Sequence, residues 1–471
     1  MQEIKTDAVV IGAGPGGYVA GIRLGQLGKR TVVVERDQPG GVCLNIGCIP
    51  SKALITAAKT YDKMRHADAM GILVEGARVD MPRLQAWKGE VVQKLTSGVR
   101  QLVKGAGAQL MAGEAKVVSP TRVVVKTREG DVGIETGAIV VATGSRPLSI
   151  PGFDIDNQRI LDSTGALALA AVPPRLAVIG GGYIGLELGI MYAKLGSQVT
   201  VIEFTPNLLP GNDPELVQVV ARKMKKFGIE AHLEARAKSW REEAGTLRVT
   251  FETKAGEKVL DCDKVLVTVG RRPNSEGLGL AEVGVQIDAK GFVTVDRQQR
   301  TSVPSIYAIG DVCGQPMLAH KASKEAEIAA EVIAGKPAEN DSNIIPAVIF
   351  SDPEIATVGM TQADAEAAGR RVKIGKYPFG GLGRAMTQLE TEGFVKVVAD
   401  AETEQVLGIH IVGPAASDLI SEAALALEMG SYLHDLALTV HPHPTLGEAV
   451  MEAAKAALGE SPHLVGGGQR R

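Results

Sequence analysis

Short apolar runs that predict buried strands alternate with longer amphipathic stretches that predict helices. Residues 8–11 and 31–34 flank one helix-like stretch that ends near Gly28, and residues 178–179 and 199–202 flank another that ends near Gly196. Strands that alternate with helices in this way are typical of parallel α/β sheets. We therefore expect two α/β domains of the doubly wound type in the first three quarters of the chain.

The pattern changes after Pro346, where strands and helices no longer alternate one by one. Strands are predicted at residues 347–350, 355–358, 371–377, 394–399 and 406–412, and helices near 361–368, 417–429 and 446–458. Between the first two domains, residues 80–104 predict a long helix and residues 108–126 predict short strands. The fold class is α/β, with a C-terminal α+β domain.

A glycine pattern occurs twice at the junction of a strand and a helix. Gly12, Gly14 and Gly17 have the G-x-G-x-x-G spacing and are followed by a second strand that ends in Glu35. Gly180, Gly182 and Gly185 repeat the pattern, and their second strand ends in Glu203. Gly180 lies 168 positions after Gly12, and Glu203 lies 168 positions after Glu35. G-x-G-x-x-G alone is weak evidence, but strand, glycines, helix, strand and acid in this order predict a dinucleotide site. A glycine-rich turn without a ligand is the alternative.

Two such sites imply two dinucleotides, and the simplest pair for electron transfer is a flavin in the first unit and a nicotinamide in the second. Glu203 favours NAD over NADP, because a carboxylate at the end of the second strand accepts from a ribose hydroxyl and repels a 2'-phosphate.

Cys43 and Cys48 are two of only four cysteines in 471 residues. On a straight helix, residues five apart are separated by about 7.5 Å of rise and about 140° of rotation, which exceeds the roughly 7 Å that a disulfide bridges. A bridge here requires a distorted turn, for which Gly41 and Gly47 supply backbone freedom, and Pro50 fits the first turn of a following helix. A tight pair of this kind is typical of redox work; two unpaired structural thiols are the alternative.

Two further segments are candidates for the site. Residues 306–312 predict a buried strand ending in Gly310 and Asp311, where a carboxylate can hold a ligand hydroxyl, and residues 317–334 predict a helix whose N-terminus can stabilise negative charge on a flavin. The exits of two apolar strands, at residues 144–147 and 270–274, resemble each other and predict only strand ends that close the nucleotide domains.

His443 and Glu448 lie close together near the C-terminus. Thr445 and Glu448 have the T-x-x-E spacing of a capping box, so Glu448 can serve only to cap a helix. It can also orient His443 as a general base.

Composition excludes several functions. The net charge is −3 without a long block of one sign, so nucleic acid and anionic membrane surfaces are not expected partners. The N-terminus, residues 1–7, has no signal-peptide pattern, and we expect no apolar run to reach the roughly 18 residues that a membrane span needs. A cytoplasmic location is expected.

The chain resembles the flavoprotein pyridine nucleotide-disulfide oxidoreductases over its whole length, and among them the dihydrolipoamide dehydrogenases. The motifs that carry the resemblance are Gly41-x-Cys43-Leu44-Asn45-x-Gly47-Cys48-Ile49-Pro50-Ser51-Lys52, Met317-Leu318-Ala319-His320-Lys321-Ala322 and His441-x-His443-Pro444-Thr445. The implied activity is oxidation of the dihydrolipoyl groups of 2-oxo acid dehydrogenase complexes, or of the glycine cleavage system, with FAD as flavin and NAD as acceptor. The implied assembly is a homodimer that binds lipoyl domains.

The resemblance also implies roles for individual residues. Cys43 exchanges with substrate, Cys48 contacts the flavin, Lys52 lies beside the flavin and pairs with Glu187, and His443 with Glu448 acts on the disulfide of the other subunit. The implied FAD residues are Gly12, Gly14, Gly17, Glu35, Lys52, Gly144, Asp311 and Ala319, and the implied NAD residues are Gly180, Gly182, Gly185, Glu203 and Gly270. No metal site is expected. The remaining histidines, and the cysteines Cys262 and Cys313, are expected to be packing or surface residues.

The domains implied are residues 1–147 for FAD with the redox pair, 148–274 for NAD, 275–345 for the second part of the FAD or central domain, and 346–471 for the dimer interface. Two departures from the family are Gly447, where many members have serine, and the loose segment 380–385.

Rival functions remain open. A glutathione-type reductase usually uses NADP, against which Glu203 argues, and a mercuric reductase has a C-terminal cysteine pair that residues 461–471 lack. A redox sensor or scaffold with a structural flavin is the non-enzymatic alternative.

Overall fold

The computed structural model describes residues 2–341 and 344–465. Met1 and residues 466–471 of the C-terminal tail, on which parts of the predictions above fall, lie outside the described residues. The chain divides into two compact units, Met1–Val172 with Leu266–Asp341, and Pro173–Val265 with Ser342–Arg471. Each unit is therefore built from two separate stretches of sequence.

The first unit has a mostly parallel sheet with the strand order β3-β2-β1-β6-β5-β4, and β17 pairs with β6. Strands β1, β2, β3, β6 and β17 are parallel, whereas β4 and β5 form an antiparallel extension. The elements of this unit are β1 (Gln2–Ile11), α1 (Pro15–Gln26), β2 (Thr31–Glu35), α2 (Gly41–Ile46), α3 (Cys48–Arg65), η1 (Ala67–Met70), α4 (Met81–Gly105), β3 (Gln109–Ala112), β4 (Glu114–Ser119), β5 (Arg122–Thr127), β6 (Gly130–Val141), β7 (Ser145–Pro147), β8 (Ile160–Leu161), α5 (Ser163–Leu167), β16 (Arg271–Pro273), β17 (Ile306–Ala308), η2 (Gly310–Val312) and α8 (Ala319–Ile333).

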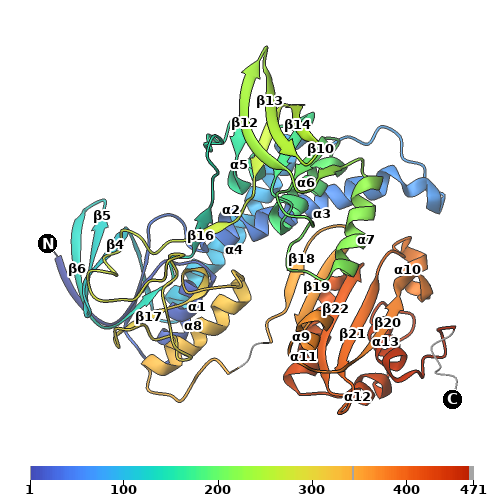
Figure 1. The fold of residues 1–471 in the computed structure, drawn as a ribbon. Coiled ribbons are helices and arrows are strands. Elements are labelled where there is room, and N and C mark those ends of the chain that lie inside the picture. Colours follow the sequence, from blue (N-terminus) through green and yellow to red (C-terminus); the bar gives the residue numbers. More distant parts are fainter. Residues whose placement is uncertain (1, 342–343, 466–471) are drawn as a thin grey trace. The chain divides into compact units, whose positions relative to one another are not determined.

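Two hydrophobic cores cover the two faces of this sheet. Along β1, Ala8 and Val10 belong to one core and Val9 and Ile11 to the other, because successive side chains of a strand point to opposite faces. Helices α1 and α8 pack side by side on the first face (Figure 1). The carboxyl ends of β1 and β17 consequently present the first glycine loop and Asp311.

The second unit combines a parallel nucleotide-type sheet, in which β10 lies between β9 and β11, with two antiparallel sheets. Its elements are β9 (Arg175–Ile179), α6 (Tyr183–Lys194), β10 (Gln198–Ile202), α7 (Pro214–Lys226), β11 (Glu230–His232), β12 (Arg236–Glu243), β13 (Thr246–Thr253), β14 (Gly256–Cys262), β15 (Lys264–Val267, which ends in the first unit), β18 (Ala347–Ile349), β19 (Glu354–Gly359), α9 (Gln362–Ala367), β20 (Val372–Pro378), η3 (Phe379–Gly381), α10 (Gly383–Gln388), β21 (Phe394–Asp400), β22 (Val406–Gly413), α11 (Ala416–Glu428), α12 (Leu433–Leu438) and α13 (Glu448–Leu458).

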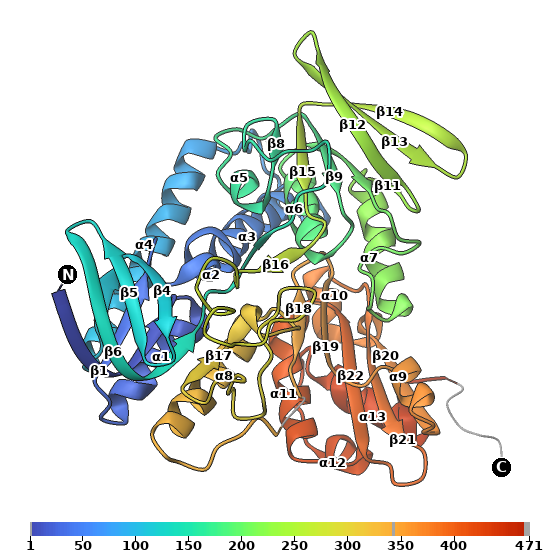
Figure 2. The same cartoon turned by 60° about the vertical axis from the view of Figure 1, so that its left-hand side comes forward.

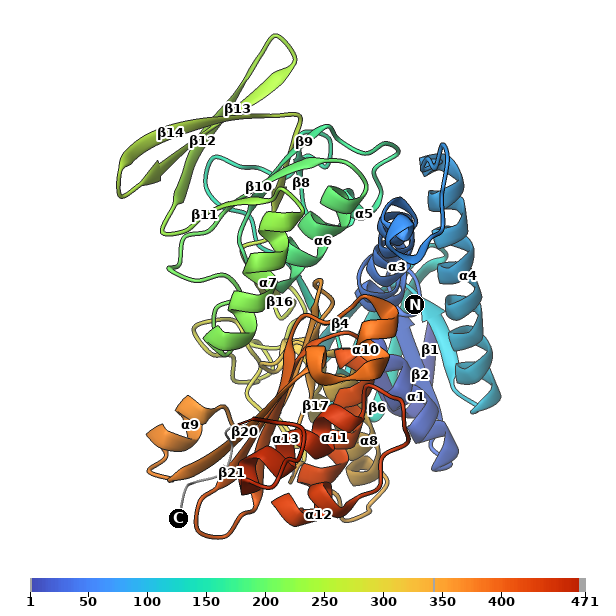
Figure 3. The same ribbon diagram turned by 90° about the vertical axis from the view of Figure 1, so that its right-hand side faces the viewer.

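Strands β12, β13 and β14 form a twisted three-stranded antiparallel ribbon (Figure 2). The C-terminal sheet has the order β18-β19-β22-β21-β20 and is antiparallel throughout. Helices α11 and α13 cover this sheet (Figure 3), and its core includes Val395, Val397, Ile409 and Ile411. The predicted C-terminal α+β domain is thus confirmed as a set of elements, with ends that shift by one or two residues.

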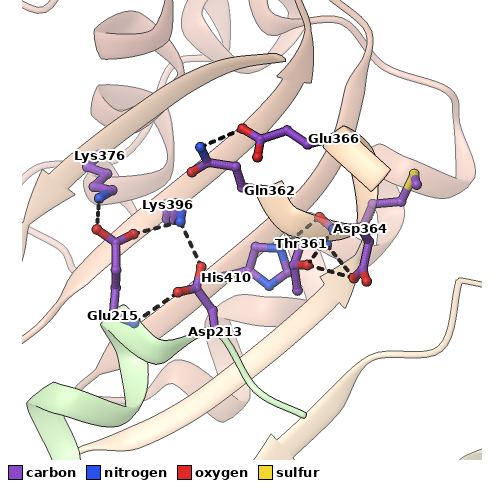
Figure 4. A network of polar contacts seen from close by, with 10 residues as sticks. Asp213, Glu215, Thr361, Gln362, Asp364, Glu366, Lys376, Lys396 and His410 are labelled. Atoms are coloured by element: carbon purple, nitrogen blue, oxygen red, sulfur yellow. Dashed lines mark hydrogen bonds and ion pairs between the residues drawn. The ribbon is translucent and has the colours of Figure 1, made fainter. Parts of the chain in front are cut away.

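A buried charge cluster joins α7 to the C-terminal sheet inside the second unit (Figure 4). The Nζ of Lys396, whose side chain is 3% exposed, lies 2.7 Å from Oδ2 of Asp213 and 2.6 Å from Oε2 of Glu215, and Lys376 binds the other oxygen of Glu215. Burial alone would lower the pKa of the Lys396 ammonium, but its bonds to the two carboxylates raise the pKa above its usual value. Nearby His410 is buried, which lowers its pKa.

One stretch, Gly41–Arg65, is long and apolar enough by length and composition to cross a membrane, with a mean hydropathy of 1.4 over 18 residues. The expectation that no stretch reaches this length was therefore wrong. The stretch is two helices, α2 and α3, and its side chains Leu44, Leu54 and Ala58 are buried in this unit. Core helices of soluble proteins pass the same test, so the finding is weak evidence for a membrane span.

Candidate active site

The two candidate redox cysteines lie on either side of a break between two helices. Cys43 is in α2, Cys48 is the first residue of α3, and Gly47 between them has φ −135° and ψ −107°. A Cβ on Gly47 would lie 2.9 Å from the carbonyl oxygen of Val42, so the break leaves room only for glycine. The predicted distortion of the turn, and Pro50 in the first turn of the next helix, are both confirmed.

The cysteine segment is attached directly to the first glycine loop. The N–H of Gly40 donates to the carbonyl oxygen of Ala13 at 2.7 Å. Gly41 has φ +57°, and a Cβ there would lie 2.6 Å from Cα of Gly14. Only glycine permits this approach, which places the cysteines next to the loop predicted to bind the flavin nucleotide.

The structure shows the pair as thiols, with a hydrogen bond between them. This bond to Cys48, followed by burial, raises the pKa of Cys43 far above its ordinary value, and the positive charge of Lys52 opposes the rise. Cys43 therefore keeps its proton at neutral pH. Cys48 is exposed and begins α3, where the helix dipole favours a thiolate.

The two glycine loops repeat one another at the level of single hydrogen bonds. The carboxylate of Glu35 accepts from Ala13 N at 2.7 Å and from Asp37 N at 2.9 Å. The carboxylate of Glu203 accepts from the equivalent atoms, Gly181 N at 2.5 Å and Thr205 N at 2.6 Å. Each acid thus holds its own glycine loop, and it does so at the place where a ribose hydroxyl would bind.

The geometry of these loops fits a dinucleotide. Gly12 (φ +99°) has no room for a side chain, since a Cβ would lie 2.4 Å from the carbonyl oxygen of Ala142, and a Cβ on Gly17 would lie 1.8 Å from Gly12 O. A Cβ on Gly182 would meet nothing within 4 Å, and one on Gly14 would meet only Cα of Gly41 at 4.0 Å. Neither α1 nor α6 has a side-chain cap. Two uncapped helix N-termini that begin at these glycines suit two pyrophosphates.

Asp311 lies in η2, directly after β17, at the same sheet edge as the first glycine loop. Its Oδ2 accepts from the hydroxyl of Ser145 at 2.5 Å. Ala319 is the first residue of α8, whose N-terminus is without a side-chain cap. Gly144 (φ +68°) begins the turn that leads to Ser145, and Gly270 (φ +133°) begins the matching turn before Arg271.

His443 and Glu448 form the expected pair in the second unit. Nδ1 of His443 lies 2.9 Å from Oε1 of Glu448, and Oε2 of Glu448 accepts from Thr445 N at 2.9 Å. Burial alone would raise the pKa of Glu448, but the Thr445 N–H and His443 hold the pKa below its usual value. The predicted capping box is wrong, because α13 begins at Glu448 itself, its N-cap is Gly447, and no side chain caps it. The carboxylate instead links the Thr445 N–H to His443, and its role in orienting a general base stays a prediction.

A second imidazole–carboxylate pair fixes the same loop. His441 places Nε2 2.7 Å from Oε1 of Glu422 and Nδ1 2.9 Å from the carbonyl oxygen of Thr439. Both ring nitrogens face acceptors, and the bond to Glu422 raises the pKa of His441. The sequence had given His441 no role; its H-x-H spacing with His443 was the available signal.

The predicted site residues divide between the two units, and the contacts predicted between residues of different units stay predictions. Cys43, Cys48 and Lys52 share the first unit with the predicted FAD residues. The second unit contains most of the predicted NAD residues and the other predicted catalytic residues, namely Gly180, Gly182, Gly185, Glu203, Glu187, His443 and Glu448. Buried Glu187 accepts from Phe350 N at 2.9 Å. Its pairing with Lys52, and the approach of His443 to a disulfide, stay predictions.

The remaining cysteines match the packing role expected of them. Cys262 is 1% exposed, and Cys313 packs against the core and donates to Gly310 O at 3.2 Å. Burial raises the pKa of the Cys262 thiol to about 12. Neither thiol is suited to nucleophilic chemistry.

Comparison with known proteins adds a family to this geometry. A family model described as pyridine nucleotide-disulphide oxidoreductase matches residues 6–326, and the model of its dimerisation domain matches residues 345–454. The chain is 50% identical over 463 residues to a dihydrolipoyl dehydrogenase of Bacillus subtilis, with 98% of each chain covered, and 49% identical over 465 residues to one of Haloferax volcanii, again with 98% of each covered.

Among solved structures, LpdA from Mycobacterium tuberculosis has a TM-score of 0.89 at 29% identity, covering 95% of this chain and 99% of its own. Because it covers 95% of this chain, the likeness extends over both units.

Proposed function

The chain belongs to the pyridine nucleotide-disulphide oxidoreductases, and we infer from this membership that it oxidises dihydrolipoyl groups to lipoyl groups and reduces NAD to NADH. The observation that carries the proposal is the thiol pair at the broken helix, with half-buried Cys43 in α2 and exposed Cys48 at the start of α3. This arrangement gives the two sulfurs different tasks.

His443 begins the reaction by taking a proton from a thiol of the substrate at Nε2, while Glu448 holds the proton on Nδ1. The resulting substrate thiolate attacks the sulfur of Cys43 and breaks the Cys43–Cys48 bond. The second substrate thiol then displaces Cys43, which takes up a proton, and the lipoyl ring closes. Cys48 is left as the thiolate at the start of α3, where the helix dipole favours the negative charge.

FAD, when bound, would supply a two-electron acceptor for the dithiol and hydride transfer to NAD. The residues proposed to hold it are the first glycine loop, Glu35, Lys52, Gly144, Asp311 and the N-terminus of α8 at Ala319. The second glycine loop, Glu203 and Gly270 are proposed to hold NAD. Lys52, four residues after Cys48 on α3, is proposed to pair with Glu187 and to stabilise charge near the flavin.

We assign residues 1–147 and 275–345 to the FAD-binding and central domains, 148–274 to the NAD-binding domain and 346–471 to the dimer interface. The proposed assembly is a homodimer in which His443 acts on the disulfide of the partner subunit. A symmetric dimer then makes two identical sites from one interface. The proposed partners are lipoyl domains of 2-oxo acid dehydrogenase complexes or of the glycine cleavage system, in the cytoplasm, where reducing conditions keep dithiols exchangeable.

The test measures NADH formed from free dihydrolipoamide, with purified protein and FAD. Turnover with NAD supports the proposal; no turnover with any dithiol, despite bound FAD, would favour a redox sensor. Subunit exchange between Cys43→Ser and His443→Gln variants then tests the dimer. One site of the mixed dimer receives both intact groups, so about half of the sites work after full exchange into mixed dimers. If mass tagging shows exchange but no activity returns, His443 acts on its own chain.

A further inference from the structure

The two strand exits that resemble each other in sequence pair with each other in the first unit. β7 and β16 form a two-stranded antiparallel ribbon in which Pro273 lies opposite Ser145. Arg271, on β16, donates from Nε to the hydroxyl oxygen of Ser145 and from Nη2 to its carbonyl oxygen, both at 2.7 Å. The serine hydroxyl in turn donates to Oδ2 of Asp311 at 2.5 Å. The three residues form a chain that runs from Arg271 to Asp311.

The direction of these hydrogen bonds is fixed by the chemistry of the groups. A guanidinium has only donors, so the Ser145 oxygen must accept from Arg271. The single hydroxyl proton of Ser145 is then free to point at Asp311, whose carboxylate accepts it. Ser145 is 3% exposed, so water does not compete effectively for this proton. One oxygen of Asp311 is thereby occupied, and the other is available for a ligand hydroxyl.

The backbone under Asp311 is held independently. The N–H of Gly310 donates to Oε2 of Glu325 at 2.7 Å, and the other carboxylate oxygen of Glu325 lies 2.8 Å from Nζ of Lys321. Both charged side chains are buried, with 5% and 8% exposed. The turn is thus fixed by α8, and the hydrogen bond from Ser145 has the separate task of orienting the Asp311 carboxylate.

We propose that Arg271 and Ser145 are positioning residues that orient the Asp311 carboxylate toward the sugar-alcohol chain of the flavin. The inference rests on the role proposed above for Asp311. Arg272, the neighbour of Arg271, is exposed and binds Glu276 instead, which makes it a matched control.

The experiment measures the dissociation constant of FAD by reconstituting apoprotein and following flavin fluorescence, without any catalytic assay. Arg271→Met is expected to raise the FAD Kd about tenfold or more, because a charge-assisted bond is lost. Arg271→Lys should recover much of this loss, since its ammonium can still donate to the Ser145 hydroxyl. Arg272→Met should leave the Kd unchanged.

Measurements in the Asp311→Asn variant distinguish the proposed positioning role of Arg271 from a purely structural role. If Arg271 acts through the carboxylate, Arg271→Met should have little further effect on the FAD Kd of the Asp311→Asn variant. An equal fold-change in both backgrounds, or an unchanged Kd in Arg271→Met, would overturn the proposal. So would wild-type FAD affinity in Asp311→Asn.

If Arg271→Met does not fold, as judged by circular dichroism and thermal melting, Ser145→Ala decides by the same criteria. The wild-type turnover assay is independent of these measurements. If the wild type shows no dihydrolipoyl activity but the FAD dissociation constants change as predicted, only the proposed function is overturned.

Discussion

Replacing Glu448 by glutamine tests how the catalytic base is oriented. In the wild type, one carboxylate oxygen faces Nδ1 of His443 and the other accepts from Thr445 N, both at 2.9 Å. An amide offers one oxygen and one NH2 group, so it cannot accept from both donors. With the oxygen on Thr445, the NH2 group faces Nδ1 and favours the tautomer that carries its proton on Nε2. That tautomer cannot take a proton from the substrate at Nε2.

The size of the effect follows from the bond that is lost. A hydrogen bond to a charged group contributes about 1.5–3 kcal/mol, and about 1.4 kcal/mol corresponds to a factor of ten in rate. The Glu448 side chain is only 16% exposed, so solvent screens the pair weakly on that side. We therefore expect kcat for dihydrolipoamide oxidation to fall by about ten- to a hundredfold. The KM for NAD should stay unchanged.

Glu452 provides the matched control for this assay. It lies one turn further along α13, is buried, and binds Ser461 and His463 rather than His443. Glu452→Gln removes the same charge from the same helix and should leave kcat within about twofold of the wild type. Thermal melting checks that both variants are folded. Wild-type kcat in Glu448→Gln, or an equal loss in Glu452→Gln, would refute the orienting role.

Three further predictions follow from other parts of the molecule. Glu203→Gln keeps an acceptor for the glycine loop but removes the charge, so the preference of kcat/KM for NAD over NADP should narrow; equal values for both nucleotides in the wild type would contradict the NAD assignment. Lys396→Met removes the cation that Asp213 and Glu215 share. Urea denaturation should then show a loss of about 3–5 kcal/mol in the free energy of unfolding. A loss under about 1 kcal/mol would show that the cluster is not a buried ion pair. His441 has a raised pKa, so its stabilising contribution should be complete below about pH 6.5 and decline as the pH rises through the folded-state pKa; a His441→Gln difference that grows with pH would contradict this.

The sequence predicted the features that depend on local spacing. The 168-residue repeat holds down to the hydrogen bonds of Glu35 and Glu203, because the same strand, turn and helix impose the same geometry. The break at Gly47 and the contact of Glu448 with His443 were predictable for the same reason, since each involves residues within five positions of one another.

Features made by distant residues were not predictable in this way. Lys396 and Asp213 are 183 positions apart, and Ser145 and Asp311 are 166 apart. Ser145 and Arg271 had each been assigned to an ordinary strand exit, because a strand does not reveal its partner in its own sequence. The ribbon β12–β14 was missed too: β13 alternates buried Leu247, Val249 and Phe251 with polar residues, but β12 and β14 on either side of it are mostly exposed.

The different tasks of the two cysteines are the central claim, and the absorbance spectrum of the flavin tests them directly. A thiolate at Cys48 in contact with oxidised flavin should give a long-wavelength charge-transfer band when the wild type takes up two electrons under anaerobic conditions. Cys43→Ser should show this band in the resting protein, and Cys48→Ser should show it in no state. A band that survives in Cys48→Ser, or two variants whose flavin spectra are both unaltered, would contradict the account.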